Sequence, residues 1–230
     1  SSFIMSAGVS DNEICNLAYE GQVALLTHRI KENSQFVNAT DQSGRNPLHW
    51  AVSAGKREVV DLLLDNNAAV NNTDDSGWSP LHIAASVGNE VIITTLLSRG
   101  ARTDARNNNR QTPLHYAASR DRLEAARALL ACGADPDASD NLQATPMHRS
   151  ASKGNTKMVQ LLLAHSASLN IQDSEGNTPL HLACDEGRIP EARLLIEAGA
   201  DCSILNKDEK TPIRMATETM KSQLHQFRGG

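Results

Sequence analysis

Residues 79–86, Ser79-Pro80-Leu81-His82-Ile83-Ala84-Ala85-Ser86, contain the tripeptide that decides the fold. Near copies of Pro-Leu-His recur at 33-residue intervals: Pro47-Leu48-His49, Pro80-Leu81-His82, Pro113-Leu114-His115, Pro146-Met147-His148, Pro179-Leu180-His181 and a degraded Pro212-Ile213-Arg214. A fixed period of roughly 20–50 residues is typical of stacked repeat arrays. Because such an array presents a long surface and no enclosed cavity, the period favours macromolecular binding over catalysis.

One repeat, residues 74–106, shows how the pattern specifies helices. The Asp, Ser and Gly residues at 74–77 indicate a turn. Ser79 then supplies an N-cap hydroxyl, and Pro80 occupies the first helical position, where its missing N–H costs nothing. We expect a first helix over residues 81–86 and a second from about residue 90 to residue 98, stopped by a left-handed glycine at residue 100. The cap position holds a hydroxyl or an amide in every copy: Asn46, Ser79, Thr112, Thr145, Thr178 and Thr211.

This pattern resembles the ankyrin repeat, whose consensus runs Asp-x-x-Gly-x-Thr-Pro-Leu-His-x-Ala-Ala and closes with Gly-Ala-Asp, as at residues 133–135 and 199–201. The resemblance implies an all-α ankyrin-repeat solenoid of seven stacked helix-turn-helix repeats with β-hairpin tips. We expect a single ankyrin-repeat domain over residues 1–230, with a capping repeat at 8–40, full repeats at 41–73, 74–106, 107–139, 140–172 and 173–205, and a second capping repeat at 206–230. The last helix is expected from about Glu218 to Phe227.

Three residues depart from the consensus where the backbone should be left-handed. Asn67 and Ser166 replace the glycine that ends the second helix, and Asp121 replaces the glycine between the two helices. Asn tolerates this conformation, whereas Ser costs about 1 kcal/mol. We therefore expect local strain at these positions and no break in the fold.

Composition and charge restrict the class of partner. Hydrophobic residues make up 40% of the chain and aromatic residues only 3%, so the core must be built from Ala, Leu, Val and Ile. The net charge is −5. Binding to nucleic acid or to an acidic membrane needs clustered Lys and Arg, so neither class of partner is expected.

The spacing of the cysteines and the lack of long apolar segments both bear on the cellular compartment of the protein. Cys15, Cys132, Cys184 and Cys202 have neither metal-type nor redox-type spacing, which indicates a reducing, intracellular setting. No stretch approaches the roughly 18 apolar residues of a membrane span, and no signal-peptide core is expected at the N-terminus. Met5 is a candidate natural start, with Ser1–Ile4 as an added segment. We expect a monomer in the cytoplasm and nucleus.

The repeated histidines suggest a metal site, but their spacing argues against one. Five of the eight histidines belong to the Pro-Leu-His blocks. Residues one repeat apart should be separated by roughly 10 Å, too far to share an ion. The ankyrin resemblance implies that each histidine locks its turn by hydrogen bonding. No nucleophile, base and orienting acid recur together, so we expect no catalytic residues, no metal and no cofactor, and a protein that is not an enzyme.

Residues 182–186 spell Leu-x-Cys-x-Glu, the motif formed by Leu182, Cys184 and Glu186 that docks into the pocket domain of the retinoblastoma protein. Cys184 aligns with Val52 and Ala85 of other repeats, at a position expected to lie in the core. Docking in an extended form would therefore require unwinding a helix between two neighbours. The motif is a possible retinoblastoma site that the physics disfavours.

The two tryptophans occupy different positions in the repeat. Trp50 aligns with Ile83 and Tyr116 on the first helix, which indicates packing. Trp78 aligns with Arg45 and Gln111 on a hairpin tip, where the fold offers little to bury it against. An exposed tryptophan on a binding rim is typical of a contact anchor.

The hairpin tips and the outer ends of the first helices form the concave face of an ankyrin stack. Candidate partner-binding residues on this face are Arg45, Asp75, Trp78, Arg120, Lys153, Glu175, Asp185 and Glu186. Their order predicts a basic middle and an acidic C-terminal end. A partner should therefore carry acids opposite the middle repeats and bases opposite the C-terminal repeats.

Three stretches, residues 74–86, 112–119 and 170–186, narrow the resemblance to the ankyrin-repeat assembly chaperones of the proteasome regulatory particle. The resemblance implies that the concave face binds the C-terminal domain of a proteasomal ATPase subunit, with links to the retinoblastoma protein and a cyclin-dependent kinase. It implies that Arg45, Asp75, Trp78, Arg120 and Glu186 are contacts, whereas Ser43 departs from an acidic family residue. The alternative is a cell-cycle or transcription adaptor that binds a cyclin-dependent kinase, the retinoblastoma protein or a transcription factor.

Overall fold

The computed structural model describes residues 8–226, and every regular element in that range is a helix. The all-α ankyrin solenoid is therefore confirmed. The hairpin tips contain turns and no strands within the described range, with hairpin-type hydrogen bonds such as the one from the Asp74 N–H to the Trp78 carbonyl (3.0 Å). The chain divides into two compact units, one ending at Arg102 and the other beginning at Thr103. The single domain expected over residues 1–230 remains a prediction.

The first unit contains the N-terminal capping repeat and two helix pairs. Its elements are α1 (Asp11–Glu20), α2 (Val23–Glu32), the 3-10 helix η1 (Ser34–Asn38), α3 (Pro47–Ser53), α4 (Arg57–Asp65), α5 (Pro80–Val87) and α6 (Glu90–Ser98). Helix α3 packs against α1, α4 and α5. Helix α3 therefore contacts the first helix of each neighbouring repeat and also its own second helix.

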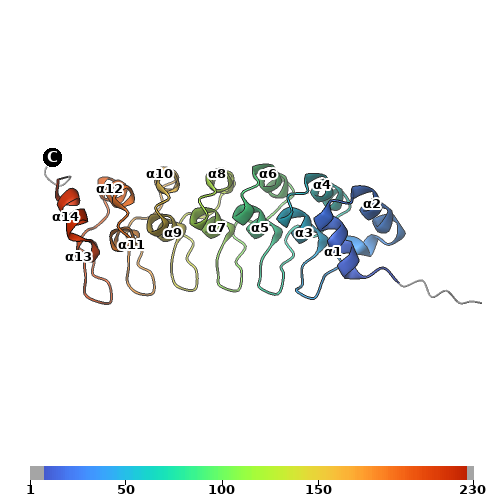
Figure 1. Ribbon diagram of the computed structural model, residues 1–230, viewed down its shortest axis with the longest axis horizontal. Helices are drawn as coiled ribbons and strands as arrows, with labels where there is room; N and C mark the ends of the chain where they lie inside the picture. The colour runs from blue at the N-terminus through green and yellow to red at the C-terminus, as the bar shows by residue number, and fades with distance from the viewer. Residues whose placement is uncertain (1–7, 227–230) are drawn as a thin grey trace, which may run out of the picture. The chain divides into compact units, whose positions relative to one another are not determined.

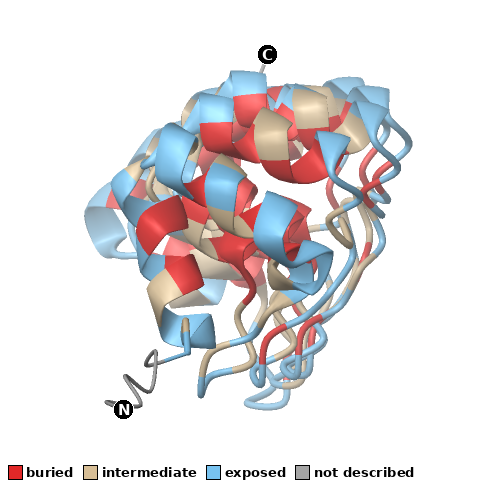
Figure 2. Cartoon of the chain, turned by 90° about the vertical axis from the view of Figure 1, so that its right-hand side faces the viewer, coloured by how far each residue is buried: buried red, intermediate tan, exposed pale blue. Residues whose placement is uncertain are grey.

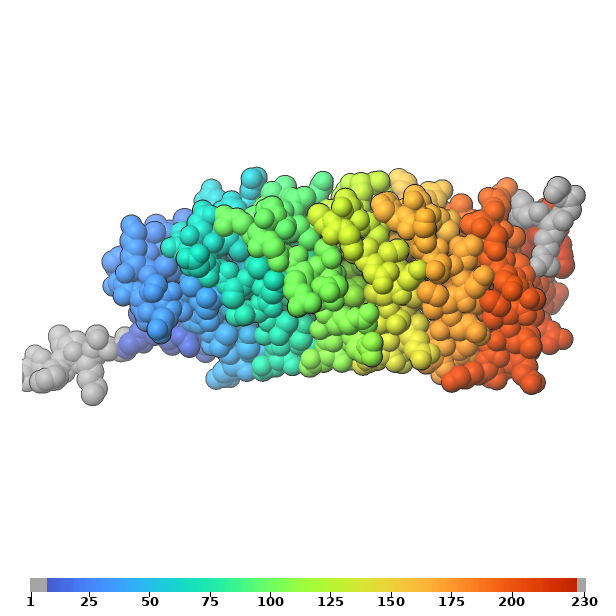
Figure 3. All heavy atoms as spheres, turned by 180° about the vertical axis from the view of Figure 1, so that it is seen from behind, coloured from blue at the N-terminus to red at the C-terminus, as the bar shows by residue number. Residues whose placement is uncertain are grey.

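The second unit continues the same pattern through four helix pairs. They are α7 (Pro113–Ser119) with α8 (Leu123–Ala131), α9 (Pro146–Lys153) with α10 (Thr156–Ala164), α11 (Pro179–Asp185) with α12 (Ile189–Glu197), and α13 (Pro212–Met215) with α14 (Glu218–His225). Within this unit the first helices form one row, the second helices form another, and the hairpin tips project beyond the first row (Figure 1). Its repeats follow in chain order as adjacent bands on the surface (Figure 3).

The helix bounds agree with the sequence pattern. Helix α6 spans the predicted residues, and α5 extends the predicted first helix by one residue at each end. Helix α14 ends at His225, before the predicted end at Phe227. Phe227 lies outside the described residues, as do Ser1–Ile4 and the candidate start at Met5.

The departures from glycine adopt the left-handed backbone that the alignment predicts. Asn67, Asp121 and Ser166 have φ angles of 64°, 54° and 59°, respectively. Gly100, at the corresponding stop in the 74–106 repeat, has φ 88°. The fold therefore retains the left-handed turn even where a side chain makes it less favourable.

Side-chain burial follows the expected composition of the core. The fully buried side chains are chiefly Leu, Ile, Val and Ala from facing helices, whereas the hairpin tips are mostly exposed or half-buried (Figure 2). In the part of the chain that the structure describes, no helix is both long and apolar enough to cross a bilayer. Among the same residues, no cluster of three metal-ligating side chains occurs.

A recurring geometry around four of the repeated histidines, His49, His115, His148 and His181, links one repeat to the next. In α9, the Thr145 N–H donates to His148 Nδ1 (3.1 Å), and the His148 N–H donates to Thr145 Oγ1 (3.4 Å). Because Nδ1 accepts, the ring proton resides on Nε2, which donates to the Asn177 carbonyl of the next tip (2.9 Å). The predicted turn-locking role of the histidine is confirmed.

The same link to a tip carbonyl recurs at three other histidines. His49 reaches the Trp78 carbonyl at 2.8 Å, and His115 and His181 reach the carbonyls of Ala144 and Lys210 at 2.9 Å. Burial lowers the pKa of His49, His115, His148 and His181. The hydrogen bond to the tip carbonyl raises the pKa of each ring, but by less than burial lowers it. These imidazoles are structural and neutral.

The cap residue of α3 fits this geometry less well than the others. Asn46 Oδ1 accepts the His49 N–H at 2.9 Å but also lies 2.8 Å from His49 Nδ1, which is itself an acceptor. Asn46 Nδ2 is buried without a hydrogen-bond partner. In α5 the hydroxyl of Ser79 accepts from the His82 N–H and lies 2.8 Å from Nδ1, where it can donate. A cap hydroxyl can therefore accept from the backbone N–H of the histidine and donate to its Nδ1 with one oxygen atom.

Replacing this amide with a hydroxyl should stabilise the first unit. Asn and Ser are equally good N-caps, so Asn46→Ser removes the unpaired donor without weakening the cap. We expect the free energy of unfolding to rise by about 1 kcal/mol, measured by urea denaturation. The reciprocal variant Ser79→Asn should lower it by a similar amount. An Asn46→Ser protein that is no more stable than the parent would contradict this reading of the cap.

Candidate protein-binding surface

In the first unit, an aromatic cluster lies beside the hairpin tips. Trp50 is half-buried on α3, its ring meets Tyr19 edge-on at 5.8 Å, and the guanidinium of Arg45 lies 5.2 Å from the Trp50 ring. The indole N–H of Trp50 donates to Asp41 Oδ2 (2.8 Å). Trp50 packs, as predicted, but it does so at the surface and not in the core.

Arg45 belongs to a hollow that the tips of two successive repeats form. Its Nε donates to Asp74 Oδ2 (3.1 Å), and this carboxylate is almost completely buried. The hollow has a volume of about 320 Å³ and is lined by Gln42, Ser43, Arg45, Trp50, Asp74, Asp75 and Ser76. Asp75 is exposed at its edge. The structure therefore brings Arg45 and Asp75 together, as the sequence predicts.

Trp78 differs from its expected environment. It is half-buried instead of exposed, with its ring 6.0 Å from that of His82 in a tilted arrangement. The backbone carbonyl of Trp78 accepts the hydrogen bond from His49. Trp78 is therefore less exposed than expected, because the repeat's own histidine covers part of the indole, and its role as a contact anchor stays a prediction.

The five candidate residues of the second unit are exposed. Arg120 caps α7, Lys153 ends α9 and Glu175 lies on a hairpin tip, whereas Asp185 and Glu186 lie at the end of α11. Within residues 8–226, none of these five side chains forms an ion pair or hydrogen bond with another residue of its unit. Exposed charges of this kind can meet a partner without first breaking an internal pair.

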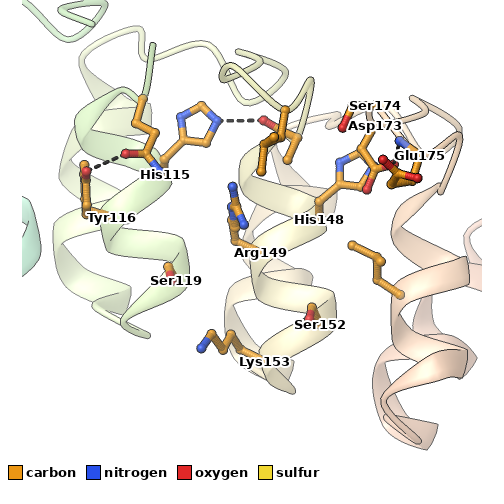
Figure 4. A pocket seen from close by; sticks show the side chains of 14 residues that line it. His115, Tyr116, Ser119, His148, Arg149, Ser152, Lys153, Asp173, Ser174 and Glu175 are labelled. Carbon is orange, nitrogen blue, oxygen red and sulfur yellow. Dashed lines mark hydrogen bonds between the residues drawn. The ribbon is translucent and has the colours of Figure 1, made fainter. Parts of the chain in front are cut away.

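A groove in the second unit joins two of these candidates. It has a volume of about 440 Å³ and lies against α7, α9, α11 and their tips (Figure 4). Lys153 and Glu175 line it, whereas Arg120, Asp185 and Glu186 do not. The remaining lining residues are Gln111, His115, Tyr116, Ser119, Leu142, Ala144, His148, Arg149, Ser152, Asp173, Ser174 and Leu182. The charged candidates of this unit therefore do not all share one site.

The sequence reasoning missed Arg149 and Asp173 among the lining residues of this groove. Arg149 reaches back from α9 to Asp140 Oδ2 at 2.5 Å. Burial alone would raise the pKa of Asp140, but the hydrogen bond and charge of Arg149, with backbone N–H groups, hold that pKa below its ordinary range. Leu142 is 57% exposed on its tip.

The Leu-x-Cys-x-Glu residues do not present a common surface. Leu182 is half-buried in the groove, Cys184 has no exposed surface and Glu186 is exposed. Burial raises the pKa of the Cys184 thiol to about 12, with smaller contributions from Cys202 and Asp185. The core position predicted for Cys184 is therefore correct.

Comparison with known proteins agrees with this architecture. The family model described as ankyrin repeats (3 copies) matches residues 13–107, 68–140 and 127–206. The chain belongs to the ankyrin repeat family. Among solved structures, the ankyrin repeat domain of Bcl-3, a member of the IkappaB protein family, is 28% identical with a TM-score of 0.83, covering 92% of this chain and 97% of that one. The human ASB11 ankyrin repeat domain is 25% identical with a TM-score of 0.83, covering 94% and 97%.

Among curated proteins, the 26S proteasome non-ATPase regulatory subunit 10, or gankyrin, is similar to part of this chain. The mouse protein is 55% identical over 60 residues and the human protein 54% identical over 60 residues. Each match covers 26% of this chain and spans only 26% of the relative's length. The resemblance to this proteasomal ankyrin protein is confirmed over that segment.

Proposed function

We propose that this ankyrin-repeat chain is an assembly chaperone of the proteasome regulatory particle that binds the C-terminal domain of a proteasomal ATPase subunit. The observation that carries the proposal is the 53–55% identity to 26S proteasome non-ATPase regulatory subunit 10. Ankyrin repeats form protein-interaction scaffolds. The exposed charges of the second unit and the Arg45 hollow of the first supply polar contacts for such a partner.

The proposed mechanism is steric and requires no chemical step. The chain occupies one ATPase domain and prevents its premature docking on the core particle until a later assembly step displaces it. Arg120 and Lys153 would meet acidic residues of the domain, and Glu175, Asp185 and Glu186 would meet basic ones. Such pairs govern register and association rate more than total affinity. A monomeric, non-enzymatic protein in the cytoplasm and nucleus is part of the same proposal.

Charge reversal at Arg120 tests the proposal most directly. Because its side chain is exposed and forms no internal pair, Arg120→Glu should leave the fold intact. We expect the dissociation constant for the ATPase C-terminal domain to rise about 10–100-fold, measured by isothermal titration calorimetry. Arg45→Glu and Trp78→Ala should also weaken binding, with circular dichroism confirming that each variant is folded.

The matched control is Arg127→Glu, which makes the same charge change on α8. Arg127 forms only an exposed i,i+3 pair with Glu124. This control should bind like the parent. If Arg45→Glu, Trp78→Ala and Arg120→Glu all retain the parental affinity, these positions do not form the binding surface.

The alternative adaptor function has one specific feature in its favour, the Leu-x-Cys-x-Glu motif. Its central Cys184 is buried within α11, between the helices on either side. Reaching that residue in an extended form would cost the packing of α11 against α9, α12 and α13. The geometry therefore favours the proteasomal proposal over retinoblastoma binding by the folded chain.

A further inference from the structure

A repeated carboxylate or amide organises each hairpin tip and usually has a second partner. In the 140–172 repeat, Asp140 Oδ1 accepts the N–H groups of Leu142 (2.8 Å) and Ala144 (3.0 Å). Its Oδ2 accepts from Arg149, nine residues further along the chain. One oxygen therefore shapes the turn, and the other is neutralised by a donor from the following helix.

Two other tip carboxylates, Asp41 and Asp74, have comparable donors at their second oxygen. Asp41 Oδ2 accepts from the indole of Trp50, also nine residues along, and Asp74 Oδ2 accepts from Arg45. In the 107–139 repeat, the Asn107 amide donates to the hydroxyl of Tyr116 (2.8 Å), again nine residues along. The pattern shows that the fold normally provides an internal partner for the group that faces the first helix.

Asp173 breaks this pattern. Its Oδ1 accepts the N–H groups of Glu175 and Asn177, each at 2.9 Å, so the turn itself is complete. The residue nine positions along is Leu182, which has no donor. Among the described residues, none donates to Asp173 Oδ2, and Lys207, which lines an adjoining hollow with Asp173, forms no ion pair with it. The half-buried carboxylate therefore lines the groove without a cation.

The rest of the groove has a matching shape and chemistry. Leu142 and Leu182 supply apolar surface next to Asp173, and Glu175 adds a second carboxylate on the same tip. Lys153 lies at the opposite end of α9 from the tips, also without an internal partner (Figure 4). A long aliphatic side chain with a cationic end would cover the leucines and reach the carboxylates.

We infer that this groove binds a lysine or arginine side chain of a protein partner, which completes the ion pair that Asp173 lacks. The cationic group lies on Asp173 and Glu175, its aliphatic part packs on Leu182 and Leu142, and a carboxylate of the same partner segment meets Lys153. The inference rests on the proposed function in one respect, because it assumes that the molecule in the groove is part of a protein. Arg149 on Asp140, one repeat earlier, is the internal example of the same contact.

Two substitutions separate this role from a structural one. Asp173→Asn keeps the turn, because Asn107 and Asn206 occupy the same position and accept the same two backbone N–H groups. Leu182→Arg places a guanidinium where Arg149 stands in the preceding repeat and should neutralise Asp173 internally. Glu124→Gln, on α8, makes the same charge change as Asp173→Asn away from the groove and serves as the control.

The first test uses no presumed partner. NMR follows the signal of the Asp173 carboxyl carbon, which is assigned by its loss in Asp173→Asn. The protein is titrated with N-acetyl-arginine methylamide and, separately, with its neutral citrulline analogue. We expect a saturable shift with the arginine compound only, and its loss in Leu182→Arg. An equal response to both compounds, or an unchanged response in Leu182→Arg, would overturn the inference.

The second test measures affinity for C-terminal domains of proteasomal ATPase subunits. Asp173→Asn and Leu182→Arg should each weaken the complex about tenfold, whereas Glu124→Gln should not. If the parent binds but both variants bind equally well, the inference is wrong and the proposed function stands. If no ATPase domain binds while the arginine titration succeeds, the proposed function is wrong and the basic-side-chain site stands.

Discussion

Acidification below about pH 6.5 should destabilise this protein steeply, well before its carboxylates titrate. Burial lowers the pKa of His49, His115, His148 and His181 in the folded chain. Below pH 6.5 the unfolded chain therefore binds more protons than the folded chain at four sites. Each such site changes the free energy of unfolding by up to about 1.4 kcal/mol per pH unit, so the limit for the four together is about 5.6 kcal/mol per pH unit.

The sign of the effect follows from the direction of the shifts. A histidine with a lowered folded pKa stabilises the fold above its unfolded pKa, and this contribution is lost as the pH falls toward the folded pKa. Asp140, whose pKa is also lowered, stabilises the fold above the ordinary range of a carboxyl group and loses this contribution only as the pH falls through and below that range. Urea denaturation at pH 7.5, 6.5 and 5.5 measures the slope. A free energy of unfolding that stays level across this range would show that the buried imidazoles accept protons without loss of structure.

The helical framework was accessible from the sequence because each decisive residue acts within its own repeat. Pro80 at the first helical position, Ser79 at the cap and Gly100 at the stop specify α5 and α6 by local backbone chemistry. Asn67 and Ser166 could be assigned left-handed angles for the same reason. Local rules also placed Cys184 in the core, because the alignment of repeats predicts which face of α11 is buried.

The binding surface was less accessible because its properties arise between repeats. The surface position of Trp50 depends on Tyr19 of the capping repeat, and Arg45 pairs with Asp74 of the following repeat. Alignment gives each residue a position but not the side chains that face it from the next repeat. The unpaired carboxylate of Asp173 is visible only once the pairs at the other tips are known.

Removing a single histidine link should be among the most damaging changes to the second unit. His148→Ala deletes the acceptor of the Thr145 N–H and the donor to the Asn177 carbonyl, and leaves a cavity in a site with no exposed surface. We expect the free energy of unfolding to fall by about 4 kcal/mol, as a result of the unsatisfied buried Thr145 N–H, the lost hydrogen bond to the Asn177 carbonyl and the lost packing. Urea denaturation at pH 7.5, where the histidine is neutral, measures this loss.

The control is His165→Ala, the same substitution on an exposed residue that ends α10. Its Nδ1 contacts only the Leu161 carbonyl (3.1 Å), so the change should cost less than about 0.5 kcal/mol. His148→Ala should also reduce the acid slope by up to about 1.4 kcal/mol per pH unit, because one titrating site has been removed. A loss no larger than that of His165→Ala would mean that the Nε2 hydrogen bond to the next tip contributes nothing net. The acid sensitivity would then need a source other than these links.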